Sequence, residues 1–240
     1  KYQADLSKPL DISIPLRAGE PNVNAWNVKP VEITPVVIGD WIGEVKQGGS
    51  VNFRNIIFNP HGNGTHTECV GHISEEDYTI NQCLNTYFFF SKLISVTPEK
   101  REEDFIITLQ QIQSAIGVQI PEAIIIRTLP NNLEKINHHY SNTNPTYIEV
   151  DAAEWMHQQN INHLLIDLPS LDKEQDEGKL LAHHAFWQYP HNTQKHRTIT
   201  EMIYVPDNIA DGYYLLNIQI ASFENDASPS KPVLYAINPL

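Results

Sequence analysis

The stretch His61-Gly-Asn-Gly-Thr-His66-Thr-Glu68-Cys-Val-Gly-His72 places three histidines and one carboxylate within twelve residues. Imidazole nitrogens and carboxylate oxygens are ordinary ligands of zinc and related divalent ions. His66 and Glu68 stand two residues apart, so in an extended segment their side chains face the same side. Gly62 and Gly64 allow tight or left-handed turns that let separate side chains converge. A lone histidine would be interpreted as a surface hydrogen-bond partner, but this cluster predicts a metal site.

The segments around this stretch predict a framework rich in β-strands. Apolar runs, β-branched content and turn residues indicate strands at Val51–Phe58, Ala123–Ile126, His163–Asp167, Thr198–Val205 and Tyr213–Ile220. Helical spacing and terminal residues indicate helices at Leu109–Ile116, which ends at Gly117, and at Val150–Asn160, which opens with Asp151. We therefore expect an α/β fold with a dominant β component, in a single domain over residues 1–240.

The charge and composition of the chain argue against some classes of binding partner. Sixteen basic and 29 acidic residues give a net charge of −13, which argues against nucleic acid and anionic membranes because both need a basic face. The apolar runs are too short to cross a bilayer, so a cytoplasmic location is expected. A cleaved N-terminal signal stays open because the sequence starts at Lys1. Cys69 and Cys83 form no disulfide framework. A buried thiol is expected for Cys69, and a disulfide between the two stays open.

The histidine-rich stretch resembles the signature of the kynurenine formamidase/cyclase family, His-x-Gly-Thr-His-x-Asp-x-Pro-x-His. Gly64-Thr65-His66, the acid at Glu68 and His72 match this signature in spacing. His61 stands five residues before His66, where the family has four. Glu68 replaces an aspartate and Val70 replaces a proline. These differences bear on the geometry of the site more than on its existence.

Other parts of the chain support the same resemblance. Asp11-Ile-Ser13-Ile-Pro15 is similar to the family's opening motif, with Asp5-Leu-Ser7 as a rival. Asp167-Leu-Pro-Ser170-Leu-Asp172 is similar to its Asp-x-x-Ser-x-Asp motif, which is followed by a histidine and a glutamate. Asp226-Ala-Ser-Pro-Ser-Lys231 is similar to the closing Asp-Gly-Ser-Pro-x-Arg stretch. The resemblance therefore reaches along the whole chain.

The resemblance implies a role for each residue at a matching position. His61 and His66 would hold one metal ion, His183 would hold a second, and Glu68 and Glu201 would bridge or share the two. His72 would donate and accept protons, and Trp26 would contact substrate. Zinc is the expected ion, with manganese as the alternative and two ions per chain. The family also implies a swivelling β/β/α fold and a homo-oligomer, dimer or tetramer.

The implied reaction is hydrolysis of a small-molecule amide, of the arylformamidase type, with N-formylkynurenine or a related aryl or cyclic amide as substrate. A bound divalent ion lowers the pKa of water to about 7, and a histidine can protonate the departing nitrogen. Hydrolysis of a cyclic amide or lactone and polyketide-type cyclisation are alternatives within the family. A non-catalytic metal-binding protein is the alternative outside it.

The other polar residues have simpler interpretations. Ser170 lacks a Gly-x-Ser-x-Gly elbow and is expected to support a turn. His184 cannot face the same way as His183 and is expected to be structural. His138-His139 lies in a polar stretch and is expected in a solvated loop. His191 and His196 lie in an insert that is exposed or forms a lid.

Overall fold

Four parallel strands form the centre of the large sheet in the computed structural model, which describes residues 1–240. In spatial order they are β8 (Phe88–Val96), β11 (Ala123–Thr128), β13 (His163–Ile166) and β14 (Thr198–Glu201). Every residue of β11, β13 and β14 is buried. This is the expected pattern for parallel strands that are covered on both faces.

Antiparallel strands extend both sides of this centre. Beyond β8 lie β15 (Gly212–Asn217) and β17 (Val233–Pro239), and β17 pairs with both β1 (Tyr2–Ala4) and β2 (Leu10–Asp11). Beyond β14 lie β7 (His66–Glu68) and β16 (Ala227–Pro229). A small separate sheet contains β12 (Tyr147–Ile148), β10 (Asp104–Ile107) and β9 (Glu99–Arg101).

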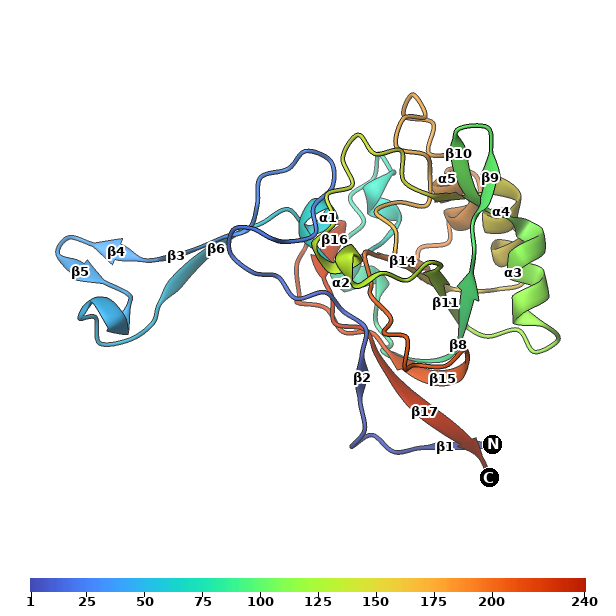
Figure 1. Cartoon of the computed structure of the whole chain (residues 1–240), viewed down its shortest axis with the longest axis horizontal. Coiled ribbons are helices and arrows are strands. Elements are labelled where there is room, and N and C mark those ends of the chain that lie inside the picture. The colour runs from blue at the N-terminus through green and yellow to red at the C-terminus, as the bar shows by residue number, and fades with distance from the viewer.

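Three helices pack together beside the sheet: α3 (Leu109–Ile116), α4 (Val150–Gln158) and α5 (Leu181–Trp187) (Figure 1). Ile124 and Ile126 of β11 pack in the same core cluster as residues of these helices. Ile125 points the other way and packs with Leu93 and Leu216 in a second cluster. This alternation follows from the two-residue period of a strand. The chain has no helix that is both long and apolar enough to cross a membrane.

The α/β fold with a dominant sheet is confirmed, and most predicted elements are present. Helix α3 has the predicted bounds and begins with a capping box between Thr108 and Gln111. The predicted helix at 150–160 is α4 and ends two residues earlier. The predicted strand at 198–205 ends at Glu201 because Met202 has a φ of 51°, which breaks the extended backbone. Helix α5, which has no side-chain cap, was not predicted.

Residues 32–57 form an arm that projects from the body of the protein (Figure 1). Its strands are β3 (Glu32–Pro35), β4 (Val37–Ile38), β5 (Trp41–Ile42) and β6 (Arg54–Ile57), and a 3₁₀ turn, η1, spans Val45–Gln47. The predicted strand at 51–58 is reduced to β6. Several large apolar side chains of the arm are exposed, namely Val37, Ile38, Val45, Val51, Phe53, Ile56 and Ile57.

Short elements complete the fold. They are α1 (Pro60–Asn63), α2 (Ile80–Cys83) and the 3₁₀ turns η2 (Val70–His72) and η3 (Leu133–Asn137). Cys69 and Cys83 are both buried free thiols, as expected for Cys69. The open alternative of a disulfide between them is not what the structure has.

Candidate metal centre

The predicted ligands meet where β7 pairs with β14. Strand β7 carries His66 and Glu68, and its register places His66 opposite Glu201 at the end of β14. His66 and Glu68 face the same side, as their spacing predicts. Helix α5 contributes His183, which is buried.

The remaining two histidines flank β7. His61 lies on α1, which starts with Pro60 at its first position and with the Asn59 side chain accepting a hydrogen bond from the Gly62 amide. This is a favourable helix start. His72 ends the turn η2. The structure therefore brings together all six residues assigned to metal binding and proton transfer.

Gly62 and Gly64 are the two glycines of the histidine-rich motif. Of the two predicted alternatives, Gly62 lies in a tight turn, the four-residue helix α1, and neither Gly62 nor Gly64 adopts a left-handed backbone. Gly62 is required by close packing, because a Cβ atom there would lie 2.5 Å from Val28 Cγ2 and 2.9 Å from the Ala25 carbonyl oxygen. The missing side chain lets α1 approach the segment that carries Trp26.

Glu68 lies at the middle of the cluster. Its Oε2 is 3.1 Å from His61 Nδ1 and 4.0 Å from His66 Nε2, whereas its Oε1 is 3.3 Å from His183 Nε2. The second carboxylate, Glu201, also faces a different histidine with each oxygen. Glu201 Oε2 is 3.4 Å from His66 Nε2, and Glu201 Oε1 is 3.8 Å from His183 Nε2. Glu68 therefore stands between His61 and His66 on one side and His183 on the other, and Glu201 stands between His66 and His183.

His61, His66 and His183 each donate a hydrogen bond from one ring nitrogen to a carbonyl or carboxylate oxygen. His66 Nδ1 donates to the Gly64 carbonyl at 3.0 Å, and His183 Nδ1 donates to Asp172 at 2.6 Å. His61 Nε2 donates to Asp226 at 2.7 Å. The opposite ring nitrogens then face the cluster. Such outer partners fix the ring orientation of metal-binding histidines.

Several atoms at the centre lack any hydrogen-bond partner although they are buried, namely His66 Nε2, both Glu68 oxygens, His183 Nε2 and Glu201 Oε1. Buried polar groups are normally satisfied, so these atoms require an explanation. Two ligands bonded to one tetrahedral zinc ion at about 2.0–2.2 Å are roughly 3.4 Å apart, which is close to the separations found here. The donor set therefore fits a divalent cation.

The electrostatics also favour a cation. No lysine or arginine pairs with Glu68 or Glu201, whose ion-pair partners are all histidines. Burial and the nearby charge of Glu68 raise the pKa of Glu201. Burial alone would lower the pKa of His61 and His183, but neighbouring carboxylates raise both to about 10. The pocket thus attracts positive charge.

A cavity of about 350 Å³ opens onto this centre. His61, His72, His183 and Glu201 line it from the metal side, and the other walls are formed by Trp26, Val28, Asn59, Pro169, Ser170 and Leu180. Trp26 has a φ of 61°, an uncommon backbone for a bulky residue. The structure therefore places Trp26 where it could contact a ligand.

Two carboxylates that hold the histidines in place received no role from the sequence. Asp172 also accepts hydrogen bonds from the backbone amides of Ala182 and His183. Asp226 lies 3.4 Å from His72 Nδ1 in addition to bonding His61. Both belong to segments with family resemblance, which is the only signal that could have identified them. His61 and Asp226 are 165 positions apart.

The structure also shows where the other polar residues considered in the sequence lie. Ser170 Oγ accepts a hydrogen bond from the Asp172 amide and thus supports a turn. His184 Nδ1 bonds the Tyr189 carbonyl and does not line the cavity. His138, His139, His191 and His196 are exposed. No residue of the 189–196 insert lines the cavity, so the insert does not act as a lid in this structure.

Comparison with family models gives a match over residues 4–173, to the family Cyclase, described as "Putative cyclase". The chain belongs to this family. Comparison with curated protein sequences gave no match.

Solved structures agree with this membership. A "Potential Metal-Dependent Hydrolase With Cyclase Activity" is 18% identical, with a TM-score of 0.70 over 97% of this chain and 99% of that chain. A predicted metal-dependent hydrolase from Bacillus stearothermophilus is 19% identical, with a TM-score of 0.65 over 95% and 98%. An isatin hydrolase bound to the product analogue thioisatinate is 16% identical, with a TM-score of 0.69 over 95% and 92%. At these identities the likeness shows a shared fold.

Proposed function

We propose that the chain is a metal-dependent hydrolase of amide bonds, with an arylformamide such as N-formylkynurenine as its substrate. One observation carries the proposal. Buried nitrogen and oxygen atoms of His66, Glu68, His183 and Glu201 face one another without any hydrogen-bond partner. Membership of the Cyclase family supports the same conclusion. Residues 1–240 would work as one hydrolase domain.

The ligands divide into two sets. His61 and His66 would hold one divalent ion and His183 the second, with Glu68 and Glu201 shared between them. Support comes from the two oxygens of Glu68, which face different histidines. Zinc is the expected ion, and the two carboxylates make manganese the alternative.

The protein's own groups suit the reaction. Divalent ions bound here would supply electrostatic stabilisation of a polarised carbonyl and a lowered pKa for attacking water. The side chain of His72 is 31% exposed and lines the cavity, its Nδ1 faces Asp226, and its Nε2 lies 3.9 Å from Glu68 Oε2 at the metal centre. That nitrogen would deliver a proton to the departing amine. Trp26 and Val28 would pack against the aryl group and keep water away.

Cyclic amides and lactones are the second candidate substrates. The similarity in fold to an isatin hydrolase favours them, because ring opening requires the same polarised carbonyl and proton donor. Polyketide-type cyclisation remains an alternative within the family. A non-catalytic metal-binding protein is the remaining alternative, and the altered first motif, with the shifted His61 and with Glu68 in place of aspartate, favours it.

Metal content and hydrolysis together test the proposal. Elemental analysis of the purified protein should find close to two divalent ions per chain. Hydrolysis of N-formylkynurenine should disappear with a chelator and return when metal is restored. Hydrolysis of isatin but not of N-formylkynurenine would establish the second candidate. Metal retention without hydrolysis of either would favour the non-catalytic alternative, and failure to bind metal would contradict all three.

We also propose a homo-oligomer, a dimer or tetramer, in the cytoplasm. The apolar side chains exposed on the arm support the assembly, because an isolated two-stranded hairpin is marginally stable in water. The free thiols of Cys69 and Cys83 support the location. Light scattering should give a mass at least twice 27.3 kDa, and the double change Ile38→Asp with Ile57→Asp should reduce it. A monomeric parent protein would contradict the assembly.

A further inference from the structure

Residues 25–28 form a tight turn that brings Trp26 to the cavity over the metal centre. The Val28 amide donates a hydrogen bond to the Ala25 carbonyl at 3.4 Å, and the φ values of Trp26 and Asn27 are 61° and 52°. Two consecutive positive φ values at the centre of a turn are the signature of type I′. Glycine, asparagine and aspartate dominate such positions. Asn27 therefore suits its place in the turn, whereas Trp26 does not.

Packing in a core does not explain this backbone of Trp26. The residue is 38% exposed and belongs to none of the three core clusters. A positive φ is a genuine outlier for a bulky residue, and such strain persists only where the surroundings hold it, commonly at sites that clamp a ligand. Because Trp26 lines the cavity over the metal centre, its strained backbone points to a role in binding a ligand there.

Two neighbouring segments hold the turn in this shape. On one side, the Ala25 amide donates to the carbonyl of Gly62 in α1 at 2.9 Å. On the other side, the Asn27 amide donates to Ser141 Oγ at 2.8 Å. This second bond is the only hydrogen bond made by the backbone of Trp26 and Asn27. The hydroxyl of Ser141 is therefore the direct support of the two strained residues.

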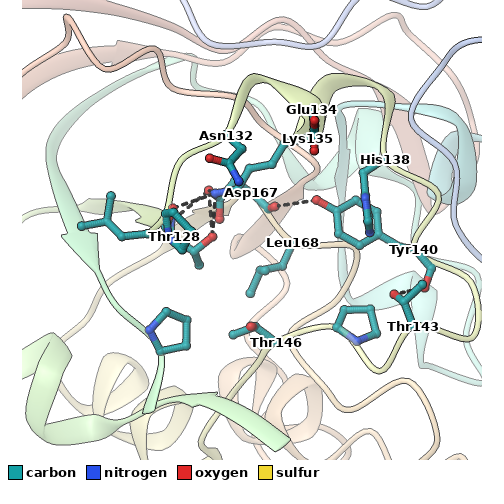
Figure 2. A pocket seen from close by; sticks show the side chains of 14 residues that line it. Thr128, Asn132, Glu134, Lys135, His138, Tyr140, Thr143, Thr146, Asp167 and Leu168 are labelled. Carbon is teal, nitrogen blue, oxygen red and sulfur yellow. Dashed lines mark hydrogen bonds and ion pairs between the residues drawn. The ribbon is translucent and has the colours of Figure 1, made fainter. Parts of the chain in front are cut away.

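The residues on either side of Ser141 are themselves fixed. Tyr140 is buried, and its hydroxyl donates to the carbonyl of Asp167, which follows β13, at 3.4 Å (Figure 2). The Asn142 amide donates to Glu174 Oε1 at 2.5 Å. Ser141 is thus held between two anchored neighbours. Its hydroxyl can fix the turn relative to the body of the protein.

We propose that Ser141 is a positioning residue that holds Trp26 as a rigid wall of the metal cavity and so makes the site selective for amides with an aromatic ring. This role rests on the proposed function, since it concerns the substrate of the same centre. No lysine, arginine or aspartate lines the cavity, so contact with the indole ring rather than an ion pair selects the part of the substrate away from the metal. A wall that is ordered in advance costs less entropy on binding.

The variants Ser141→Ala and Ser141→Thr separate this role from a general contribution to the fold. In the metal-loaded protein, Ser141→Ala should raise KM for formanilide by about 2- to 10-fold, the factor that corresponds to the loss of one hydrogen bond between neutral groups. Its kcat and metal content should equal those of the parent protein. Ser141→Thr keeps the hydroxyl and should restore the parent KM. Ser7→Ala, which removes an exposed hydroxyl bonded to Asp5, is the matched control and should have no effect.

Binding of aniline, the amine product of formanilide hydrolysis, reports on Trp26 without turnover. The indole N–H resonance that disappears in Trp26→Phe identifies this residue among the four tryptophans. That resonance should shift saturably with aniline in the metal-loaded parent protein, and Ser141→Ala should weaken the binding by the same factor as it raises KM. Parent-like KM and aniline affinity in Ser141→Ala would overturn the proposal. Loss of metal from that variant would overturn it too, because Ser141 would then act on the metal centre.

Failure of the proposed function would give a different result. A parent protein that binds aniline at Trp26 but does not hydrolyse formanilide would contradict the hydrolase. The dependence of aniline binding on Ser141 would still decide whether Ser141 positions Trp26. Conversely, a parent protein that hydrolyses formanilide while aniline leaves the Trp26 resonance unchanged would keep the hydrolase and overturn the aromatic wall.

Discussion

Two buried carboxylate sites lie along the same edge of the large sheet, and they are neutralised in opposite ways. At the end of β13, Asp167 has an internal cation, Lys135, at 2.7 Å. Where β14 meets β7, Glu68 and Glu201 have histidines as their only ion-pair partners. A buried carboxylate without a counterion is costly. The charge of the first site is therefore neutralised within the chain, whereas the second depends on a cation from solution.

Replacing Glu68 with Gln should have the largest effect. The change keeps the size of the side chain but removes the charge that both groups of histidines face. The variant should lose most of the metal that the parent protein binds, and hydrolysis should decrease by far more than the roughly 10–100-fold typical of an outer-shell loss. Elemental analysis and initial rates measure both quantities. Full metal content in this variant would remove Glu68 from the ligand set.

Replacing Lys135 with Met should destabilise the fold without affecting metal content. Removing one partner of a buried ion pair costs about 3–5 kcal/mol in the free energy of unfolding. Lys173→Met is the matched control, because its pair with Asp104 is more exposed and such pairs contribute about 0–1 kcal/mol. Denaturant unfolding compares the two. Equal losses in the free energy of unfolding would mean that the buried pair of Lys135 and Asp167 stabilises the fold no more than the exposed pair of Lys173 and Asp104.

Replacing Asp226 with Asn should have an intermediate effect at the metal centre. It removes the carboxylate that holds His61 and faces His72, and comparable changes cost about 10–100-fold in metal affinity or activity. Competition with a chelator measures the affinity. Asp151→Asn, at an exposed position on α4, should change neither quantity. If the Asp226 variant matched the parent, each histidine would be held adequately by its own surroundings.

The sequence predicts local features of this molecule well. Thr108 and Gln111 lie three positions apart in the chain, and the helix they begin has the predicted bounds. The pair His66 and Glu68 faces one side because strand geometry alone requires it. In such cases the interacting groups are neighbours in sequence, so their spacing contains the information.

Features that depend on distant packing could not be predicted in the same way. Asp226 reaches His61 only because β16 pairs with β7, and no local pattern predicts that pairing. Gly62 is required by the proximity of Val28, not by its own backbone. The polar turn before α5 has no side-chain cap, so the helix that carries His183 gives no starting signal.

The smallest predicted effect on stability concerns His163, which lies at the opposite end of β13 from Asp167. His163 is buried against the Phe89 ring and bonds the Thr198 hydroxyl at 2.8 Å. Burial lowers its pKa from 6.5 to about 3, in contrast to the raised pKa of His61 and His183. Between pH 6.5 and about pH 3, the unfolded chain carries a proton on His163 that the folded protein does not bind. The free energy of unfolding therefore falls as pH falls through this range.

His163→Gln removes this proton linkage. The difference in the free energy of unfolding between variant and parent should therefore move in favour of the variant by about 2 kcal/mol from pH 7.5 to pH 5. Denaturant unfolding at both pH values measures it, and any general cost of the substitution cancels in the comparison. His191→Gln, at an exposed position, should show no such change. A pH-independent difference for His163→Gln would mean that the folded protein accommodates a charged imidazole there, and burial would then not separate this histidine from those at the metal centre.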